Sequence, residues 1–225
     1  MQGTALVNST ATRSGHDTRV VVVDDHQMFA EGLGMALGRA EGLEVAGTAG
    51  TIDEAVSLVR IHRPEVVVID YRLPDGTGIE AVEKFRVDVP AVRIVLVTGS
   101  VTDHVLREAI ETGCHGLLHK GEAISEVVRA VHAAANGDLM LSPGIIDRVR
   151  PGTMAGTTTL TSRQREVLVG IARGRTAHEL ASELSISYHT ARNHIRDTLE
   201  RLDARNQLEG VVTALRQGVI SLEEL

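Results

Sequence analysis

Five polar residues of the types that handle phosphoryl groups stand at the ends of short apolar runs in the first half of the chain. Asp24 and Asp25 end the first run, Asp70 the third, Thr98 the fourth, and Lys120 follows the fifth. Carboxylates gathered in one crevice raise one another's pKa unless a cation lies among them, and a site rich in oxygen ligands suits Mg²⁺. With an Asp nucleophile, a Lys to neutralise the transferred oxygens and a Thr to hydrogen-bond the product, these residues predict a phosphoryl-handling site.

A second group of residues, near the C-terminus, has the chemistry of DNA recognition. His189, Arg192, Asn193 and Arg196 share one face of a helix that we predict from the N-cap Ser187 to about Leu202. Arginine pairs with guanine and asparagine with adenine in the major groove. An arginine-bearing helix face is more often simply solvated, but the position of this one after a short capped turn favours base readout. The residues expected to contact DNA phosphates are Ser187, Thr190, Arg201 and Arg205.

The elements that position the first group alternate β-branched runs with amphipathic helical stretches. The runs are Val20–Asp24, Leu43–Thr48, Val66–Asp70, Ile94–Thr98 and Gly116–His119. Continuous apolar runs suit strands buried on both faces, and strands separated by helices predict a five-stranded parallel, doubly wound α/β sheet. In the flavodoxin-like strand order 2-1-3-4-5, the carboxyl ends of the first and third strands flank one crevice.

The second half is predicted to be all-α, with four helices. Pairs of Thr161 with Gln164 and of Thr176 with Glu179 form capping boxes, and Gly174 suits a left-handed helix end. The predicted domains are a flexible tail over 1–18, an α/β domain over 19–137, a linker over 138–159 with a short helix around 145–149, and a helical domain over 160–225. The last helix, 206–216, is expected to present four apolar side chains as a dimer surface; these are Leu208, Val211, Val212 and Leu215.

Composition limits the classes of protein. Residues 1–150 carry a net charge of −7 and residues 151–225 a net charge of zero, so the acidic half is not expected to contact the phosphate backbone. A single cysteine, Cys114, excludes an internal disulfide and is ordinary for the reducing cytoplasm. We find no secretory signal and no apolar stretch of about 18 residues, so we expect a cytoplasmic protein without membrane spans.

Motifs in both halves resemble those of a known family. The segments Val-Val-Asp24-Asp25-His26, Asp70-Tyr-Arg-Leu-Pro-Asp-Gly-Thr-Gly, Thr98-Gly-Ser and Leu-Leu-His-Lys120 resemble the signature blocks of receiver domains. Residues 160–215 resemble a LuxR-type helix-turn-helix, and together they resemble the NarL/FixJ class of bacterial response regulators.

The resemblance implies a transcription factor rather than an enzyme. A sensor histidine kinase would phosphorylate Asp70, with Mg²⁺ held by Asp25, Asp70 and the backbone carbonyl of Arg72, and with Asp24 acting through a water. Phosphorylation would control dimerisation and binding to double-stranded promoter DNA, where Arg192, Asn193 and Arg196 would contact the groove. The protein would bind DNA as a homodimer, and RNA polymerase is a further candidate partner.

One position departs from the family pattern. Receivers usually carry Tyr or Phe three residues before the conserved Lys, and this chain has Leu117 there. The usual coupling between Thr98 and an aromatic ring therefore cannot operate as such. This leaves open a phosphorylation-independent DNA-binding regulator whose receiver serves as a dimerisation module. If phosphorylation does control the protein, we expect the unphosphorylated receiver to cover the face from Arg192 to Arg196.

A phosphohydrolase and a histidine metal site fit the sequence less well. A phosphohydrolase with an Asp nucleophile would normally carry an acid/base Asp two residues later, where this chain has Arg72. Metal binding by the ten histidines lacks a matching cluster, since His115 and His119 lie on a predicted strand and His189 and His194 do not share a helix face well.

Overall fold

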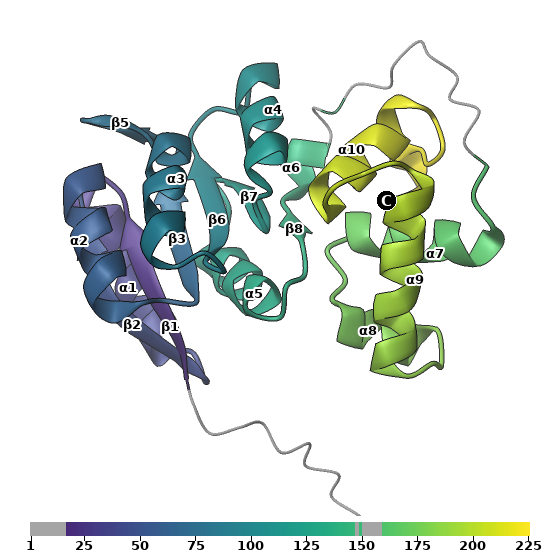
Figure 1. The fold of residues 1–225 in the computed structure, drawn as a ribbon, viewed down its shortest axis with the longest axis horizontal. Helices are drawn as coiled ribbons and strands as arrows, with labels where there is room; N and C mark the ends of the chain where they lie inside the picture. The colour runs from purple at the N-terminus through teal and green to yellow at the C-terminus, as the bar shows by residue number, and fades with distance from the viewer. Residues whose placement is uncertain (1–16, 147–148, 150–158) are drawn as a thin grey trace, which may run out of the picture.

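The computed structural model describes residues 17–146, 149 and 159–225. Figure 1 shows a sheet with helices on both faces beside a helical body that contains the C-terminus. Residues 1–16 of the predicted tail over 1–18 and most of the second half of the predicted linker lie outside the described residues. The last residue of the predicted tail, Thr18, already belongs to the first strand of the sheet.

The sheet confirms the predicted fold class and strand order. Its strands run in the order β2-β1-β3-β6-β7-β8, and every pairing is parallel. The five strands that correspond to the predicted runs are β1 (Thr18–Val23), β2 (Leu43–Ala49), β3 (Val66–Asp70), β6 (Arg93–Thr98) and β7 (Gly116–His119). This order brings the carboxyl ends of β1 and β3 side by side, where Val23 pairs with Ile69.

A sixth parallel strand was not predicted. β8 (Met140–Leu141) pairs with β7 through Gly116 with Met140 and Leu117 with Leu141. It lies in the segment predicted as linker, so the first part of that segment extends the sheet. A small antiparallel pair, β4 (Arg72–Leu73) with β5 (Gly76–Thr77), also lies just after the carboxyl end of β3.

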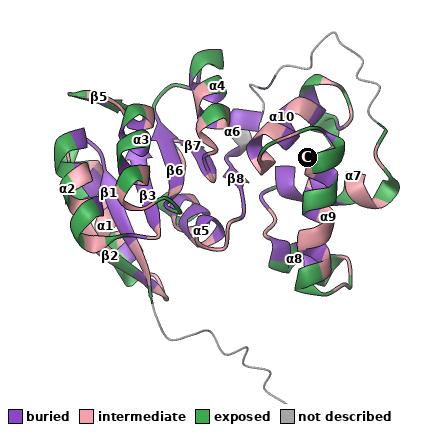
Figure 2. Cartoon of the chain, in the orientation of Figure 1, coloured by how far each residue is buried: buried purple, intermediate pink, exposed green. Residues whose placement is uncertain are grey.

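Helices cover both faces of the sheet because the side chains of each strand alternate between them. Val20 and Val22 pack with α1 (Gln27–Arg39) and α5 (Ile124–Ala135). Val21 and Val23 belong to the core of the other face, which α2 (Ile52–His62), α3 (Gly78–Asp88) and α4 (Asp103–Thr112) cover. Figure 2 shows the inner strands β3, β6 and β7 almost wholly buried and the helices exposed on one side only.

The C-terminal body contains the four predicted helices. They are α7 (Ser162–Ala172), α8 (Ala177–Glu183), α9 (Tyr188–Arg201) and α10 (Gln207–Arg216), and a 3₁₀ turn, η1 (Leu222–Glu224), follows. Both predicted capping boxes form, at Thr161 with Gln164 and at Thr176 with Glu179. Gly174 has a φ of 72°, as predicted for a left-handed helix end. The short helix predicted around 145–149 appears as α6 (Pro143–Ile146), and residues 147–148 lie outside the described part.

The expectation that the apolar side of α10 is an exposed dimer surface is wrong. Leu208, Val211, Val212 and Leu215 are each 2% exposed or less. The amphipathic pattern predicted a buried face correctly, but this chain's own hydrophobic core buries it. That core and the α2–α4 face of the sheet form one cluster of buried side chains, to which Leu139 and Leu141 also belong.

Candidate functional site

Lys120 lies between two buried carboxylates at the carboxyl edge of the sheet. Its Nζ is 2.6 Å from Oδ2 of Asp24 and 2.6 Å from Oδ2 of Asp70. The two aspartates are 3% and 5% exposed. Asp24 directly follows β1, Asp70 ends β3 and Lys120 directly follows β7, so the predicted convergence of the strand ends occurs. The ammonium group supplies the cation that neighbouring carboxylates require.

The electrostatics of this cluster follow from burial. Burial raises the pKa of Asp70 and the nearby Asp24 charge raises it further, and these effects outweigh the lowering by Lys120. For Lys120, burial opposes the charged form, but its hydrogen bonds to Asp24 and Asp70 prevail and raise its pKa. The ammonium group therefore stays charged at neutral pH, whereas burial makes the charged carboxylate of Asp70 energetically unfavourable.

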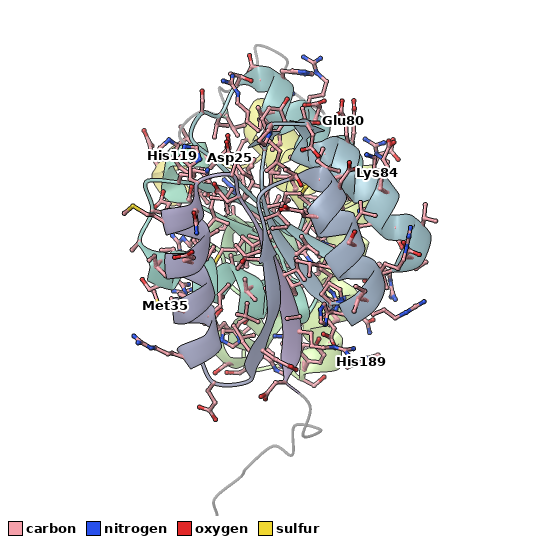
Figure 3. The ribbon with its side chains drawn as sticks, turned by 90° about the vertical axis from the view of Figure 1, so that its left-hand side faces the viewer. Asp25, Met35, Glu80, Lys84, His119 and His189 are labelled. Carbon is pink, nitrogen blue, oxygen red and sulfur yellow. The ribbon has the colours of Figure 1, made fainter. Side chains whose placement is uncertain are left out.

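Oxygen ligands for a cation gather at the same edge. Ligand atoms of Asp24, Asp25, His26 and Asp70 all lie within 4.8 Å of one another. His26 Nδ1 is 2.8 Å from Oδ1 of Asp25 and 3.2 Å from Oδ1 of Asp24. No role was predicted for His26, although its position directly after two aspartates was an available signal. Figure 3 shows Asp25 at the same end of the sheet as His119.

Two further residues predicted for this site, Arg72 and Thr98, line the same open cleft as Asp25, Asp70 and Lys120. The backbone N–H of Arg72 donates to Oδ1 of Asp70 at 3.3 Å. The Thr98 hydroxyl is buried and donates to the carbonyl of Ser100 at 3.1 Å. All five residues predicted from the strand ends are thus brought together.

Leu117 is fully buried on β7 and has no polar atom in its side chain. Tyr71, which directly follows Asp70, was not predicted to belong to the site. The Tyr71 side chain is almost completely buried, and its hydroxyl donates to Oε2 of Glu108 on α4 at 2.6 Å. Burial, reinforced by the Glu108 carboxylate, raises the pKa of Tyr71 to about 12, so the phenol stays protonated.

The face of α9 is only partly open. His189 and Arg196 are exposed, whereas Arg192 and Asn193 are half-buried. Arg196 lies 3.5 Å from Asp197 and 3.8 Å from Glu200. Ser187 caps the helix by accepting a hydrogen bond from the N–H of Thr190, as predicted.

Two further arginines predicted to contact phosphates have acceptors within the chain. Arg205 makes two hydrogen bonds to the Glu209 carboxylate, each of 3.0 Å. Nε of Arg201 donates to the carbonyl of Thr159 at 3.3 Å. Both arginines are exposed, so these partners can be exchanged for phosphate oxygens.

Arg192 is held against the segment between α5 and β8. Its Nη1 lies 3.4 Å from Oδ1 of Asp138 and 3.4 Å from the carbonyl of Gly137. Asp138 is 1% exposed, and burial raises its pKa despite the backbone N–H of Ala177 and the charge of Arg192, which lower it. Nothing local in the sequence singled out Asp138, because its partners are on α8 and α9.

No helix in the described part of the chain is both long and apolar enough to cross a bilayer.

Comparisons with known proteins match both halves. Residues 20–132 match the family model of the response regulator receiver domain, and residues 158–214 match that of the bacterial regulatory proteins of the luxR family. The transcriptional regulatory protein DesR of Bacillus subtilis is 30% identical over 199 residues, which cover 88% of this chain and 97% of DesR.

Solved structures give the same result. A two-component response regulator of the LuxR family from Aurantimonas sp. SI85-9A1 is 32% identical with a TM-score of 0.54, covering 58% of this chain and 94% of that one. A structure of two RcsB dimers bound to two parallel DNAs has a TM-score of 0.55 and 20% identity, covering 89% of this chain and all of the RcsB chain, which shows the fold alone.

Proposed function

This chain belongs to the response regulators that join a receiver domain to a LuxR-type helix-turn-helix domain, which are DNA-binding transcription factors rather than enzymes. From this membership we propose that a sensor histidine kinase phosphorylates Asp70. Phosphorylation in turn controls dimerisation and promoter binding. The observation that carries the proposal is the position of Lys120, 2.6 Å from both Asp24 and Asp70 in a cleft that Thr98 also lines.

Phosphoryl transfer needs a nucleophile with one accessible oxygen. Oδ2 of Asp70 contacts Lys120, while Oδ1 accepts only a long hydrogen bond from the backbone of Arg72. A carboxylate oxygen of Asp70 attacks the phosphorus of a phosphohistidine; the new P–O bond forms as the P–N bond breaks, and the histidine nitrogen keeps that electron pair. Lys120 neutralises the transferred oxygens, and Thr98 rotates from Ser100 to hydrogen-bond one of them.

The residues present fit Mg²⁺. Three carboxylates at one edge exceed the charge that a single ammonium balances, and hard oxygen ligands are those that Mg²⁺ prefers. Asp25, Asp70 and the backbone carbonyl of Arg72 would hold the ion, with Asp24 acting through a water. When bound, Mg²⁺ offsets negative charge on the transferred group.

The C-terminal domain reads DNA through α9. Arg192, Asn193 and Arg196 contact base edges in the major groove, with His189 beside them. The phosphate contacts come from Ser187, Thr190, Arg201 and Arg205. Because this domain carries no net charge, a single copy binds DNA weakly, and a homodimer on paired half-sites supplies the affinity. The similar RcsB chain forms dimers on DNA, which supports this arrangement.

The contact between Arg192 and Asp138 supports an inhibitory role for the unphosphorylated receiver. The contact engages one base-reading side chain and leaves Arg196 and His189 exposed, so the receiver covers part of the predicted Arg192–Arg196 face. Phosphorylation releases this contact and frees α9 for the major groove.

RNA polymerase is a further partner of the DNA-bound dimer. We propose domain boundaries at 19–137 and 160–225, with β8 extending the receiver's sheet beyond the first of these ranges, and a cytoplasmic location.

The test is intact-mass analysis of the full chain after incubation with acetyl phosphate and Mg²⁺, with Asp70→Ala as the control. We expect one phosphoryl group on the wild-type chain and none on the variant. The rival function, in which the receiver is only a dimerisation module, predicts no adduct on the wild-type chain or on the Asp70→Ala variant.

A further inference from the structure

Receivers usually carry an aromatic residue at the position that Leu117 occupies here. In this chain Tyr71 brings an aromatic ring to the same site. It is covalently next to Asp70, is 8% exposed, and its hydroxyl reaches out of the sheet to α4, where it meets Glu108 at 2.6 Å. Leu117 offers no group that could make or break a polar contact. Tyr71 is therefore an aromatic side chain with a polar group that can report a change at Asp70.

The backbone of Tyr71 is fixed on both sides. Its N–H donates to the carbonyl of Val97 at 3.0 Å, and its carbonyl accepts from the N–H of Gly78 at 2.8 Å. Val97 precedes Thr98, which lines the cleft together with Asp70. A displacement of either Asp70 or Thr98 thus acts directly on Tyr71, since close-packed and hydrogen-bonded neighbours transmit small shifts.

The helix that Tyr71 contacts also touches the DNA-binding domain. Near the C-terminal end of α4, the carbonyl of Ile110 accepts a hydrogen bond of 3.0 Å from Nδ2 of Asn206. The other side-chain atom of Asn206, Oδ1, accepts from the N–H of Glu209 and caps α10. Figure 1 shows α4 on the side of the sheet that faces α10.

We infer that Tyr71 is a positioning residue that couples Asp70 to the DNA-binding domain, through Glu108 on α4 and then the hydrogen bond between Ile110 and Asn206. The inference rests on the proposed phosphorylation of Asp70. Phosphorylation shifts Tyr71, the shift moves α4 through the Glu108 carboxylate, and the hydrogen bond to Asn206 breaks. The buried phenol remains a donor throughout, because its pKa lies far above neutrality.

The test is hydrogen exchange of the full chain before and after phosphorylation with acetyl phosphate, with the adduct counted by intact mass. In the wild-type chain we expect the amides of α4 and of the first turn of α10 to exchange about tenfold faster once Asp70 is phosphorylated, within the usual range of coupling between sites. In Tyr71→Phe, which keeps the ring and loses the hydroxyl, the adduct forms and the change is less than about twofold.

Two further variants make the result specific. Asn206→Asp keeps the oxygen that caps α10 and loses the donor to Ile110, so the first turn of α10 exchanges fast even without phosphorylation. His104→Ala is the matched control. The exposed side chain of His104 lies 3.6 Å from the same Glu108 carboxylate, but it is not part of the proposed route from Asp70 to Asn206. The His104→Ala variant responds like the wild type.

The outcomes separate this inference from the function beneath it. An adduct on Tyr71→Phe together with a full tenfold response in α4 and α10 overturns the coupling role of Tyr71 alone. A normal response in Asn206→Asp also overturns it. The absence of an adduct on the wild-type chain overturns the proposed function and this inference with it.

Discussion

The guanidinium group of Arg192, on α9 of the DNA-binding domain, lies 3.4 Å from the carboxylate of Asp138, in the segment between α5 and β8. Asp138 is buried and also accepts from the N–H of Ala177, the first residue of α8. One carboxylate just after α5 thus contacts both helices of the helix-turn-helix.

Replacement of Asp138 by asparagine should release part of the inhibition. Asp138→Asn keeps an acceptor for Ala177 but loses the charge that holds Arg192. Because the arginine side chain is 39% exposed, screening limits the effect, and we expect the unphosphorylated chain to bind DNA about threefold to tenfold more tightly. Fluorescence anisotropy with a duplex selected from a random library measures this. Asp88→Asn, which removes the partner of Arg60 within the receiver, is the control; an equal gain there would refute the specific role of Asp138.

The exposed Arg196 should contribute to sequence reading. Arg196→Ala is expected to weaken binding to the selected duplex by roughly 1–3 kcal/mol and to relax the base preference at one position. Arg216→Ala, at the exposed end of α10, should lower affinity only slightly. Equal losses on selected and scrambled duplexes would instead identify Arg196 as a phosphate contact.

Loss of the central cation should destabilise the receiver. Lys120→Met leaves Asp24 and Asp70 buried side by side without a positive partner, at an expected cost of roughly 2–4 kcal/mol at pH 7. Lowering the pH to about 5 should recover part of this loss, because the carboxyls can then take up protons. Urea unfolding at both pH values tests this, with the exposed Lys84→Met as the control. A cost that does not change with pH would contradict the electrostatic explanation.

The raised pKa of Asp70 predicts a stability that depends on pH. A group whose pKa is raised on folding contributes stability at low pH, and this contribution is lost as the pH rises through the folded-state pKa. Asp70→Asn should therefore be more stable than the wild type by about 1 kcal/mol at pH 7, while Lys120 keeps Asp24 as a partner. The difference should shrink as the pH falls toward 4. A variant that is less stable than the wild type at pH 7 would show that the contact with Lys120 outweighs burial.

Local signals explain why so much of the fold could be predicted. The β-branched runs and the caps at Thr161 and Thr176 act within a few residues, and parallel strand order then brings Asp24, Asp70 and Lys120 together. β8 escaped prediction because two residues, Met140 and Leu141, form no run of their own.

Features that depend on contacts between distant parts of the chain could not be predicted. Tyr71 meets Glu108, and Asp138 meets Arg192, across 37 and 54 residues respectively. The apolar stripe on α10 showed that one face is buried, but an amphipathic pattern does not say whether the same chain or a second copy buries it. The sites of coupling between the domains therefore required the structure.

The central claim is that phosphorylation of Asp70 controls DNA binding, and the most direct measurement is the affinity of the full chain for a selected duplex before and after phosphorylation. Acetyl phosphate with Mg²⁺ supplies the phosphoryl group, and intact mass gives the fraction modified. We predict binding that is about tenfold tighter after phosphorylation, with no response in Asp70→Ala. Unchanged affinity of a fully phosphorylated wild-type chain would contradict the claim, and would favour a receiver that serves only for dimerisation.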